Sequence, residues 1–512
     1  MEPFGQGKSF LRHRVFFFLC AVLILCYGSV VYATYGFSDD YSELLAHLSG
    51  DRYPWAARMA SGRPINAALN DLVFLLVPNI GALRYLRLLS IFAVAGTAWV
   101  IYLVLTYAEW DFWQAVCAAL IIASLPSFQV YVSFALTASF SFSMLTAGLS
   151  VYFIERSAMK SEPRTNLLLG GSVLMLALSV LNYQPAAMFF WVLATIVSFS
   201  SDATPKNIIR RLLRYFIVFA PAMGIGLCAY ILGKRKYGIG YIGPERAALN
   251  HDLIGKLRWF LLNPLPDALN LINLFPHRSI AVAVLCFISV GLFLYFQGRV
   301  RDRLANMFIA GLLVPVVYLP NLVIAENFSP YRTQIALTSL IAIYAFLALK
   351  GFVARVPYEK RAAVVDATMF ATASICLFVA AYHVQVYFTR PQSVELEFMR
   401  QQLVHRGSGH TPSLIWIFGA NPISPMAPGK RYDEFGLSST AQPWAPGPEA
   451  ILLLRSSNLL LTDVSIRVIV PEPLDQPVVA KWLAEQSIHV SQAGSTAPPD
   501  ALVVDMRNLK GK

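Results

Sequence analysis

The chain contains little charge. Of its 512 residues, 14% are Asp, Glu, Lys or Arg, while 56% are apolar when Ala, Cys and the aromatic residues are included. A soluble globular protein carries about a quarter charged residues. This composition therefore excludes an ordinary soluble enzyme and indicates a protein that is largely embedded in a membrane.

Cysteine is missing from the polar stretches. All six cysteines lie within apolar runs, which argues against a disulfide framework. The chain also lacks a P-loop, a His/Cys metal-ligand spacing, a Gly-x-Ser-x-Gly elbow and a dinucleotide-binding fingerprint. These absences disfavour catalysis driven by cytoplasmic ATP or a soluble nucleotide sugar, and we expect no nucleic-acid partner.

Long apolar runs dominate what is present. A membrane-crossing helix needs roughly 20 residues, and eleven runs approach that length: residues 15–33, 88–107, 112–132, 134–154, 167–181, 186–199, 215–232, 280–296, 307–325, 333–349 and 362–388. The first follows basic residues but lacks a convincing cleavage site, so we expect an uncleaved span. The fold class predicted is an all-α polytopic membrane protein with about eleven transmembrane helices.

The basic residues indicate the orientation. They gather before the first run and in the short loops at 156–164, 206–214, 299–303 and 350–361. Short loops rich in Lys and Arg stay in the cytoplasm, so the N-terminus is expected there. With an odd number of spans, the opposite face then carries the loops 34–87, 233–279 and 326–332 and the tail from residue 389.

The tail differs in character from the rest. Its apolar runs shrink to strand length at 413–418, 450–454, 464–470 and 501–505, and residues 478–486 have a helical pattern. We expect a small α/β module outside the membrane. The predicted organisation is a transmembrane domain over 1–388 and a C-terminal domain over 389–512.

Two adjacent carboxylates, Asp39 and Asp40, follow the first apolar run. At the lipid–water boundary, such a pair suits deprotonation of an acceptor hydroxyl. It also suits a divalent cation, Mg²⁺ or Mn²⁺, held against a phosphate leaving group. The alternative is that Ser38 and Asp39 cap a short helix that begins near Tyr41.

The same loop continues with arginines and aromatic residues, among them Trp55 and Arg63. Aromatic faces suit a pyranose ring and guanidinium groups suit phosphate. Arg63 is equally interpreted as a head-group anchor. Residues 65–76 have the pattern of an amphipathic helix on the membrane interface.

A second candidate segment precedes the tenth run and holds Glu326, Tyr331 and Arg332. An arginine at the end of a span is costly unless it faces a cavity or reaches the interface, so we predict that Arg332 contacts an anion. Glu326 and Tyr331 are predicted sugar or acceptor contacts. The alternatives are an interface anchor for Arg332 and a salt bridge between Arg332 and Glu326.

The second external loop holds a basic cluster that includes Arg235 and Lys236. Positive charge outside runs against the usual asymmetry, and a lipid phosphate or pyrophosphate is the simplest explanation, with plain head-group contact as the alternative. Residues 182–185 form a polar connection between two short spans, and the alternative is that this segment is only a turn.

Four short motifs in this order resemble the GtrII-like O-antigen glucosyltransferases, relatives of the GT-C superfamily: Asp39-Asp40, Gly62-Arg63-Pro64, Tyr183-Gln184-Pro185 and Pro330-Tyr331-Arg332-Thr333. The resemblance covers residues 15–349. It implies an enzyme of the bacterial inner membrane that takes a sugar from a polyprenyl-phosphate carrier on the periplasmic face and adds it to a glycan or lipid-linked acceptor.

The resemblance also implies residue roles. Asp39 or Asp40 would be the catalytic carboxylate, Arg332 would contact the carrier phosphate with support from Arg63, and Tyr183 and Gln184 would line the sugar cavity. Some related enzymes need a divalent metal and others do not, so the cofactor stays open.

Two rival interpretations remain. A lipid-linked sugar transporter or flippase would carry charge at mid-membrane, whereas the polar groups here collect on one face. An O-antigen polymerase or ligase would keep the external face and the lipid carrier but transfer a different group.

Overall fold

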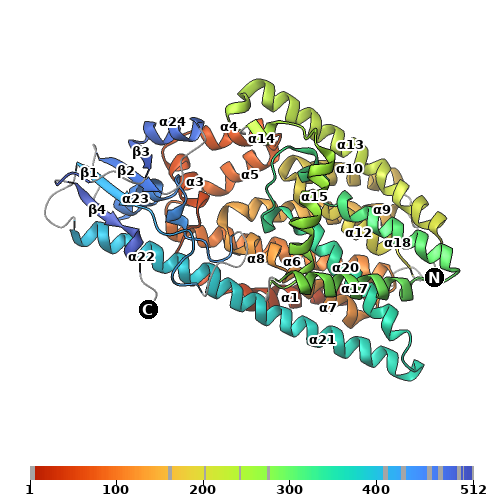
Figure 1. Ribbon diagram of the computed structural model, residues 1–512. Helices are drawn as coiled ribbons and strands as arrows, with labels where there is room; N and C mark the ends of the chain where they lie inside the picture. The colour runs from red at the N-terminus through yellow and green to blue at the C-terminus, as the bar shows by residue number, and fades with distance from the viewer. Residues whose placement is uncertain are drawn as a thin grey trace.

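The computed structural model describes residues 6–158, 164–200, 203–241, 244–273, 277–406, 413–427, 434–457, 464–470, 477–492, 497–499 and 501–509. Helices form most of this structure, and a small sheet lies at one end of the elongated helical bundle (Figure 1).

The bundle and its short connecting helices comprise α1 (Gln6–Tyr27), α2 (Ser29–Tyr32), α6 (Leu83–Tyr107), α7 (Phe112–Ala123), α8 (Pro126–Ser133), η2 (Ala135–Thr137), α9 (Ala138–Ser157), α10 (Thr165–Asn182), α11 (Gln184–Ala187), α12 (Phe189–Ser198), α13 (Pro205–Tyr237), α17 (Arg278–Tyr295), α18 (Val300–Val316), α19 (Leu319–Val323), η4 (Tyr331–Thr333), α20 (Ile335–Val353) and α21 (Tyr358–His383). The two longer loops form α3 (Asp39–Leu48), α4 (Tyr53–Ala60), α5 (Pro64–Phe74), η1 (Ile80–Ala82), η3 (Ile239–Tyr241), α14 (Pro244–Ala247), α15 (Leu253–Leu262) and α16 (Pro264–Leu269).

Within the described residues, seven helical segments are long and apolar enough to cross a membrane: Ile80–Tyr107, Ala135–Ser157, Thr165–Asn182, Pro205–Tyr237, Arg278–Tyr295, Ile335–Val353 and Tyr358–Val404. The pair α7 and α8, bent by 61°, would be an eighth. The expected number of eleven is thus not confirmed. Prolines explain part of the difference, because they stand in the first turns of α8, α11 and α19 and interrupt the apolar runs there.

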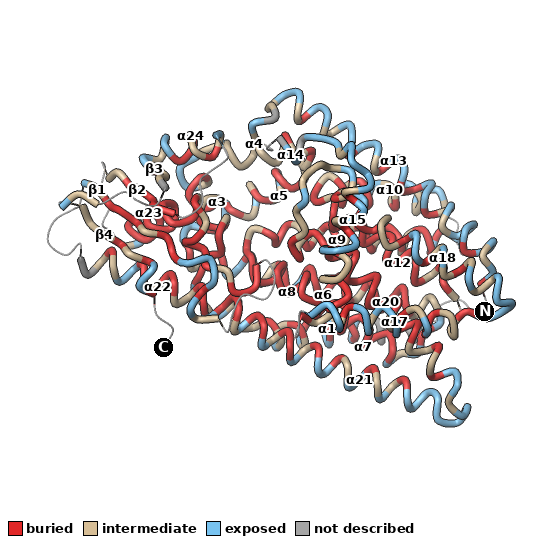
Figure 2. The backbone as a smooth tube through the Cα atoms, in the orientation of Figure 1, coloured by how far each residue is buried: buried red, intermediate tan, exposed pale blue. Residues whose placement is uncertain are grey.

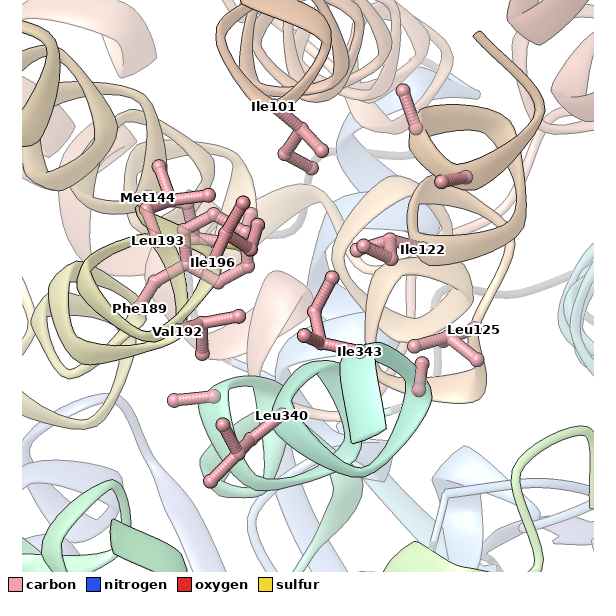
Figure 3. Packing of buried hydrophobic residues seen from close by; sticks show 14 of the residues in the cluster. Ile101, Ile122, Leu125, Met144, Phe189, Val192, Leu193, Ile196, Leu340 and Ile343 are labelled. Carbon is pink, nitrogen blue, oxygen red and sulfur yellow. The ribbon is translucent and has the colours of Figure 1, made fainter. Parts of the chain in front are cut away.

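The core of the bundle is apolar. Side chains from α6, α7, α9, α12 and α20 meet in its interior, where Ile101, Ile122, Met144, Leu193 and Ile343 are all buried (Figure 3). The outer helices alternate buried and exposed turns (Figure 2). On α13 the exposed side chains include large apolar ones, as expected for a helix that faces lipid.

The C-terminal part contains η5 (Val384–Thr389), α22 (Arg390–Arg406), β1 (Leu414–Phe418), η6 (Ser439–Ala441), α23 (Pro446–Ser456), β2 (Ser465–Val470), α24 (Pro477–Glu485), β3 (Ile488–Gln492), β4 (Leu502–Asp505) and η7 (Met506–Asn508). All pairs in its four-stranded sheet are parallel, in the order β3-β2-β1-β4. The expected α/β module is therefore present.

One predicted strand of the module is wrong. Residues 450–454 lie inside α23, because prolines in its first turn favour a helix start and a buried helix tolerates a continuous apolar run. The strand β3 was not predicted; its sequence, IHVSQ, is short and only weakly apolar.

The module packs directly on the loop that holds α3. Tyr41 and Leu44 of α3 share one hydrophobic core with Ile415 of β1 and Leu453 of α23, and Figure 1 shows α3 beside the sheet. The expected boundary at residue 388 falls where α21, η5 and α22 follow one another without a break. The two-domain division stays a prediction.

Candidate active site

The turn before α3 carries the two predicted aspartates. The helix begins at Asp39, as the capping alternative anticipated, but the Ser38 side chain makes no capping hydrogen bond. Ser38 instead has φ of 46°, a value that non-glycine residues rarely adopt. Such strained positions persist only where the surroundings hold them, and they cluster at functional sites.

Asp40 is fully buried and bonds to the backbone. Its Oδ2 accepts hydrogen bonds from the N–H groups of Phe37 (2.9 Å) and Ala135 (3.3 Å), and its Oδ1 accepts one from Leu136 (2.7 Å). Burial raises the pKa of Asp40 to about 7, although the Arg87 charge and these N–H groups act in the opposite direction. The Asp40 carboxyl therefore ties the first loop to η2.

Asp39 lies differently. It is half-buried, and its Oδ1 accepts a hydrogen bond of 2.6 Å from Nε1 of Trp444. Among the described residues, no group donates a hydrogen bond to the second oxygen, Oδ2. Of the two aspartates, Asp39 is thus the one with an oxygen available to another molecule.

The pair does not fit a shared divalent cation. Both oxygens of Asp40 accept from backbone N–H groups, so coordination would require breaking these bonds. Over the described ranges, His, Cys, Asp and Glu side chains form no group of three or more that could hold a metal ion. Metal dependence therefore stays a prediction, and the placement of Asp39 and Asp40 does not support it.

A buried ion pair adjoins Asp39. Arg58 of α4 contacts Glu43 of α3 at 2.7 Å, and each side chain is only 11% exposed. Tyr53 lies beside them; burial, followed by the charges of Asp39 and Glu43, raises the pKa of its hydroxyl. The first loop thus holds an ion pair one helical turn from Asp39.

The Gly62-Arg63 turn brings Arg63 to Tyr183 and Gln184. Gly62 has φ of 70°, and a Cβ there would lie 2.7 Å from Cα of Tyr230, so the position requires glycine. Arg63 then donates from Nε to Oε1 of Gln184 (2.9 Å), and its guanidinium lies 4.8 Å from the centre of the Tyr183 ring. Residues 183 and 184 are thus more than a simple turn.

Arg332, within the segment predicted to contact sugar or acceptor, and Arg246 of α14 both lie near Phe328. Their guanidinium groups are 5.4 Å and 5.3 Å from the centre of the Phe328 ring. Arg246 pairs with Glu326 at 2.8 Å, and Nη1 of Arg332 lies 3.4 Å from Oε1 of Glu434. Glu326 is therefore an ion-pair partner of Arg246 in this structure, while Arg332 pairs with Glu434 of the tail.

Contacts link Tyr183 to two of the arginines. The Arg63 guanidinium lies 4.8 Å from the centre of the Tyr183 ring. That ring stacks on Phe140, which also contacts Tyr131, and the Tyr131 hydroxyl donates to the Arg332 carbonyl at 2.8 Å.

Burial raises the pKa of the Tyr183 hydroxyl, and the charges of Arg63, Arg332 and Arg246 act in the opposite direction. Burial lowers the pKa of Arg63, and the neighbouring positive charges of Arg246 and Arg58 lower it further. An anion bound among these side chains would relieve that repulsion.

Some predicted residues lie apart from this cluster or are enclosed. Arg235 and Lys236 are exposed in the last turn of α13, and Arg235 lines a shallow hollow with Tyr230 and Gly238. Tyr331 is 1% exposed and packs its ring against Phe435, within a buried aromatic cluster.

Trp55 is half-buried on α4, and the Arg52 guanidinium lies 5.9 Å from the centre of its ring. Its predicted contact with a sugar stays a prediction, as does the phosphate-binding role of the α13 basic residues.

Several site residues were missed. Trp444 and Glu434 belong to the tail, more than 100 residues beyond the last motif, and no local pattern marks them. Lys256 of α15 donates from Nζ to the Glu326 carbonyl (2.7 Å) and to Oδ1 of Asn327 (3.0 Å), and burial lowers its pKa to about 8. Of the missed residues, only Arg246 could have been inferred from the sequence, because it lies in the basic cluster of the loop 233–279.

Solved structures of other proteins resemble the fold of this chain. The structure is similar to an archaeal oligosaccharyltransferase, AglB from Archaeoglobus fulgidus in complex with an inhibitory peptide and a dolichol-phosphate, with a TM-score of 0.42, 10% identity and coverage of 90% of this chain and 70% of that one. The apo form of the Archaeoglobus fulgidus oligosaccharyltransferase gives a TM-score of 0.38 and 9% identity, covering 81% of this chain and 63% of that one.

None of the curated proteins compared with the chain matches it. The family model for glucosyl transferase GtrII matches residues 39–349, more than half of the chain, and that range includes Asp39, Arg63, Tyr183 and Arg332. The resemblance seen in the sequence is thereby confirmed: the chain belongs to the glucosyl transferase GtrII family and is a membrane glycosyltransferase.

Proposed function

We propose that this glycosyltransferase moves a hexose, with glucose the first candidate, from a polyprenyl-phosphate carrier to a cell-surface glycan such as O-antigen. The reaction would take place on the periplasmic face of the bacterial inner membrane. The observation that carries the proposal is that the guanidinium groups of Arg332 and Arg246 lie 5.4 Å and 5.3 Å from the centre of one ring, that of Phe328. Arg58 pairs with Glu43, which lies one helical turn after Asp39 on α3, so the arginine-rich first loop also carries the candidate base.

The three arginines of the site suit the donor phosphate. Arg63, Arg246 and Arg332 carry three positive charges: Arg246 pairs with Glu326, Arg332 with Glu434, and Arg63 donates to the neutral amide of Gln184. Preorganised guanidinium groups stabilise the charge that develops on a leaving phosphate more than the charge of the bound donor, which is the condition for accelerating the reaction.

The neighbouring helix α15 supports a lipid-linked donor. Its exposed side chains include Leu253, Ile254 and Leu257, while the Lys256 side chain between them is buried beside Glu326. An exposed apolar face next to a basic one is typical of a helix that lies in the membrane interface. Such a position would hold the arginines at the level of lipid phosphates.

The Asp39 carboxylate suits activation of the acceptor. We assign Asp39 as the base that takes the proton from an acceptor hydroxyl, because its Oδ2 has no donor among the described residues and Asp40 does not offer a comparable atom. The hydroxyl oxygen forms the new bond to the anomeric carbon. The bond from that carbon to the phosphate oxygen breaks, and its electron pair leaves with the phosphate. A single displacement of this kind inverts the anomeric configuration.

The test is linkage analysis of surface glycans from a deletion strain complemented with wild type, Asp39→Asn or Asp40→Asn. Loss of one sugar branch that wild type and Asp40→Asn restore, and Asp39→Asn does not, supports the proposal. Collapse of the glycan chain length would favour a polymerase or ligase. Full restoration by Asp39→Asn would overturn the assigned base and bring a transporter back into consideration.

A further inference from the structure

We propose that Trp444, which belongs to the C-terminal module, is a positioning residue for Asp39. The module would then complete the active site instead of serving only as an accessory domain. The inference rests on the proposed function, because it requires Asp39 to be the base. It depends on residues 434–445, hereafter called the 434–445 segment. This segment contains η6, precedes α23 and makes hydrogen bonds to the turn at the start of α3.

Trp444 holds Asp39 through a direct contact. Its indole N–H donates to Oδ1 of Asp39 at 2.6 Å, a short distance typical of hydrogen bonds to a charged acceptor. The backbone of Trp444 is fixed as well, because the Ser42 hydroxyl donates to its carbonyl at 2.9 Å. With Oδ1 held in this way, the rotation of the carboxylate is restricted and the direction of Oδ2 is set.

The same segment also supports the strained residue before Asp39. The backbone N–H of Ser38 donates to Oγ of Ser439 at 2.8 Å, and that hydroxyl donates to Oε1 of Gln392 at 2.6 Å. Two contacts from one segment therefore bracket the turn that presents Asp39. A residue with φ of 46° needs such external support.

The segment is itself fixed to α22. Glu395, which is 1% exposed, accepts hydrogen bonds from the backbone N–H groups of Ser439 (3.2 Å) and Thr440 (2.8 Å). The base is thus oriented by a rigid element of the module. A general base must lie within hydrogen-bond reach of its proton, and small errors in its placement reduce the rate strongly.

The chain offers a matched control. Trp416 of β1 lies in the same module and is 3% exposed, and its Nε1 has no hydrogen-bond partner in the described part of the chain. Replacing either tryptophan with phenylalanine removes a similar volume, while only Trp444→Phe removes a donor to Asp39.

The experiment measures kcat and donor KM for the purified full-length protein with a polyprenyl-phosphate-linked hexose and an isolated glycan acceptor. Trp444→Phe should lower kcat roughly tenfold to a hundredfold, the range set by one hydrogen bond to a charged group. Donor KM should stay unchanged, and Trp416→Phe should retain wild-type kcat. Benzothienylalanine at position 444 replaces the N–H with sulfur at nearly constant shape, so it should reproduce the loss even if the phenylalanine variant folds poorly.

Wild-type kcat in the benzothienylalanine variant, or equal losses in Trp444→Phe and Trp416→Phe, would overturn the positioning role. Asp39→Asn separates the two levels of the argument. If Asp39→Asn is inactive while both position 444 variants are fully active, only the role of Trp444 fails. If Asp39→Asn is active, the proposed base fails first.

Discussion

Replacing Asp39 and Asp40 one at a time tests whether Asp39 acts as the base while Asp40 stabilises the fold. Asp40 accepts three backbone hydrogen bonds in a fully buried position. Asp40→Ala leaves these three N–H groups without their acceptor. An unsatisfied buried donor costs about 1–3 kcal/mol, so we expect a loss of at least about 3 kcal/mol in the free energy of unfolding. Asp40→Asn keeps one oxygen acceptor and should lose about 1–3 kcal/mol.

Asp39→Asn should behave in the opposite way. An asparagine oxygen can still accept from Trp444, so we expect thermal stability in detergent to change little. Transfer should fall by roughly a hundredfold to ten-thousandfold, the usual contribution of a general base. The assay combines thermal unfolding of purified protein with initial rates of sugar transfer, normalised to folded protein. An Asp40→Asn protein that is stable but inactive, beside an active Asp39→Asn, would refute the reasoning.

Three further predictions concern the donor site and the fold. Arg332→Gln should lower kcat/KM for the lipid-linked donor by about 10²–10³-fold, while Arg210→Gln, exposed near the start of α13, should leave it near wild type in the same assay; equal losses would contradict the proposed phosphate site. Because burial raises the pKa of Asp40 to about 7, above its value of about 3.9 in an unfolded chain, the folded state binds more protons between these values. This stabilisation is therefore present at acid pH and lost as the pH rises toward 7, so the excess in Tm of wild type over Asp40→Asn should shrink over that range, and an excess that grows with pH would count against the buried titration. Gly62→Ala should lower membrane abundance and Tm, because its Cβ would lie 2.7 Å from Cα of Tyr230; an unchanged Tm would show that the turn can relax.

The sequence predicted local features well. Apolar runs identified many helices of the bundle, because hydropathy read over about 11–18 residues is enough to indicate a buried or lipid-facing helix. Three of the four strands were identified for the same reason. Where the prediction failed, at 450–454 and in the number of spans, the apolar run alone could not separate a strand from a buried helix or a full crossing from a shorter, proline-interrupted one.

The order of short motifs was enough to indicate the family, while the phosphate-binding roles of Arg63 and Arg332 stay predictions. The sequence could not distinguish Asp39 from Asp40. These neighbours have the same chemistry and the same local context, and only the packed structure places one among backbone N–H groups and leaves an oxygen of the other without a donor among the described residues.

The sequence by itself determined that this chain is a helical membrane protein with a small α/β module and a polar face rich in arginine. These properties follow from composition and from periodicity within a few residues. Tertiary structure alone decided which charges pair and which residues complete the site. Trp444 contacts Asp39 across 405 positions of the chain, and Glu434 reaches Arg332 from the tail. Such contacts depend on how the C-terminal module packs against α3, and no periodicity within a few residues encodes that packing.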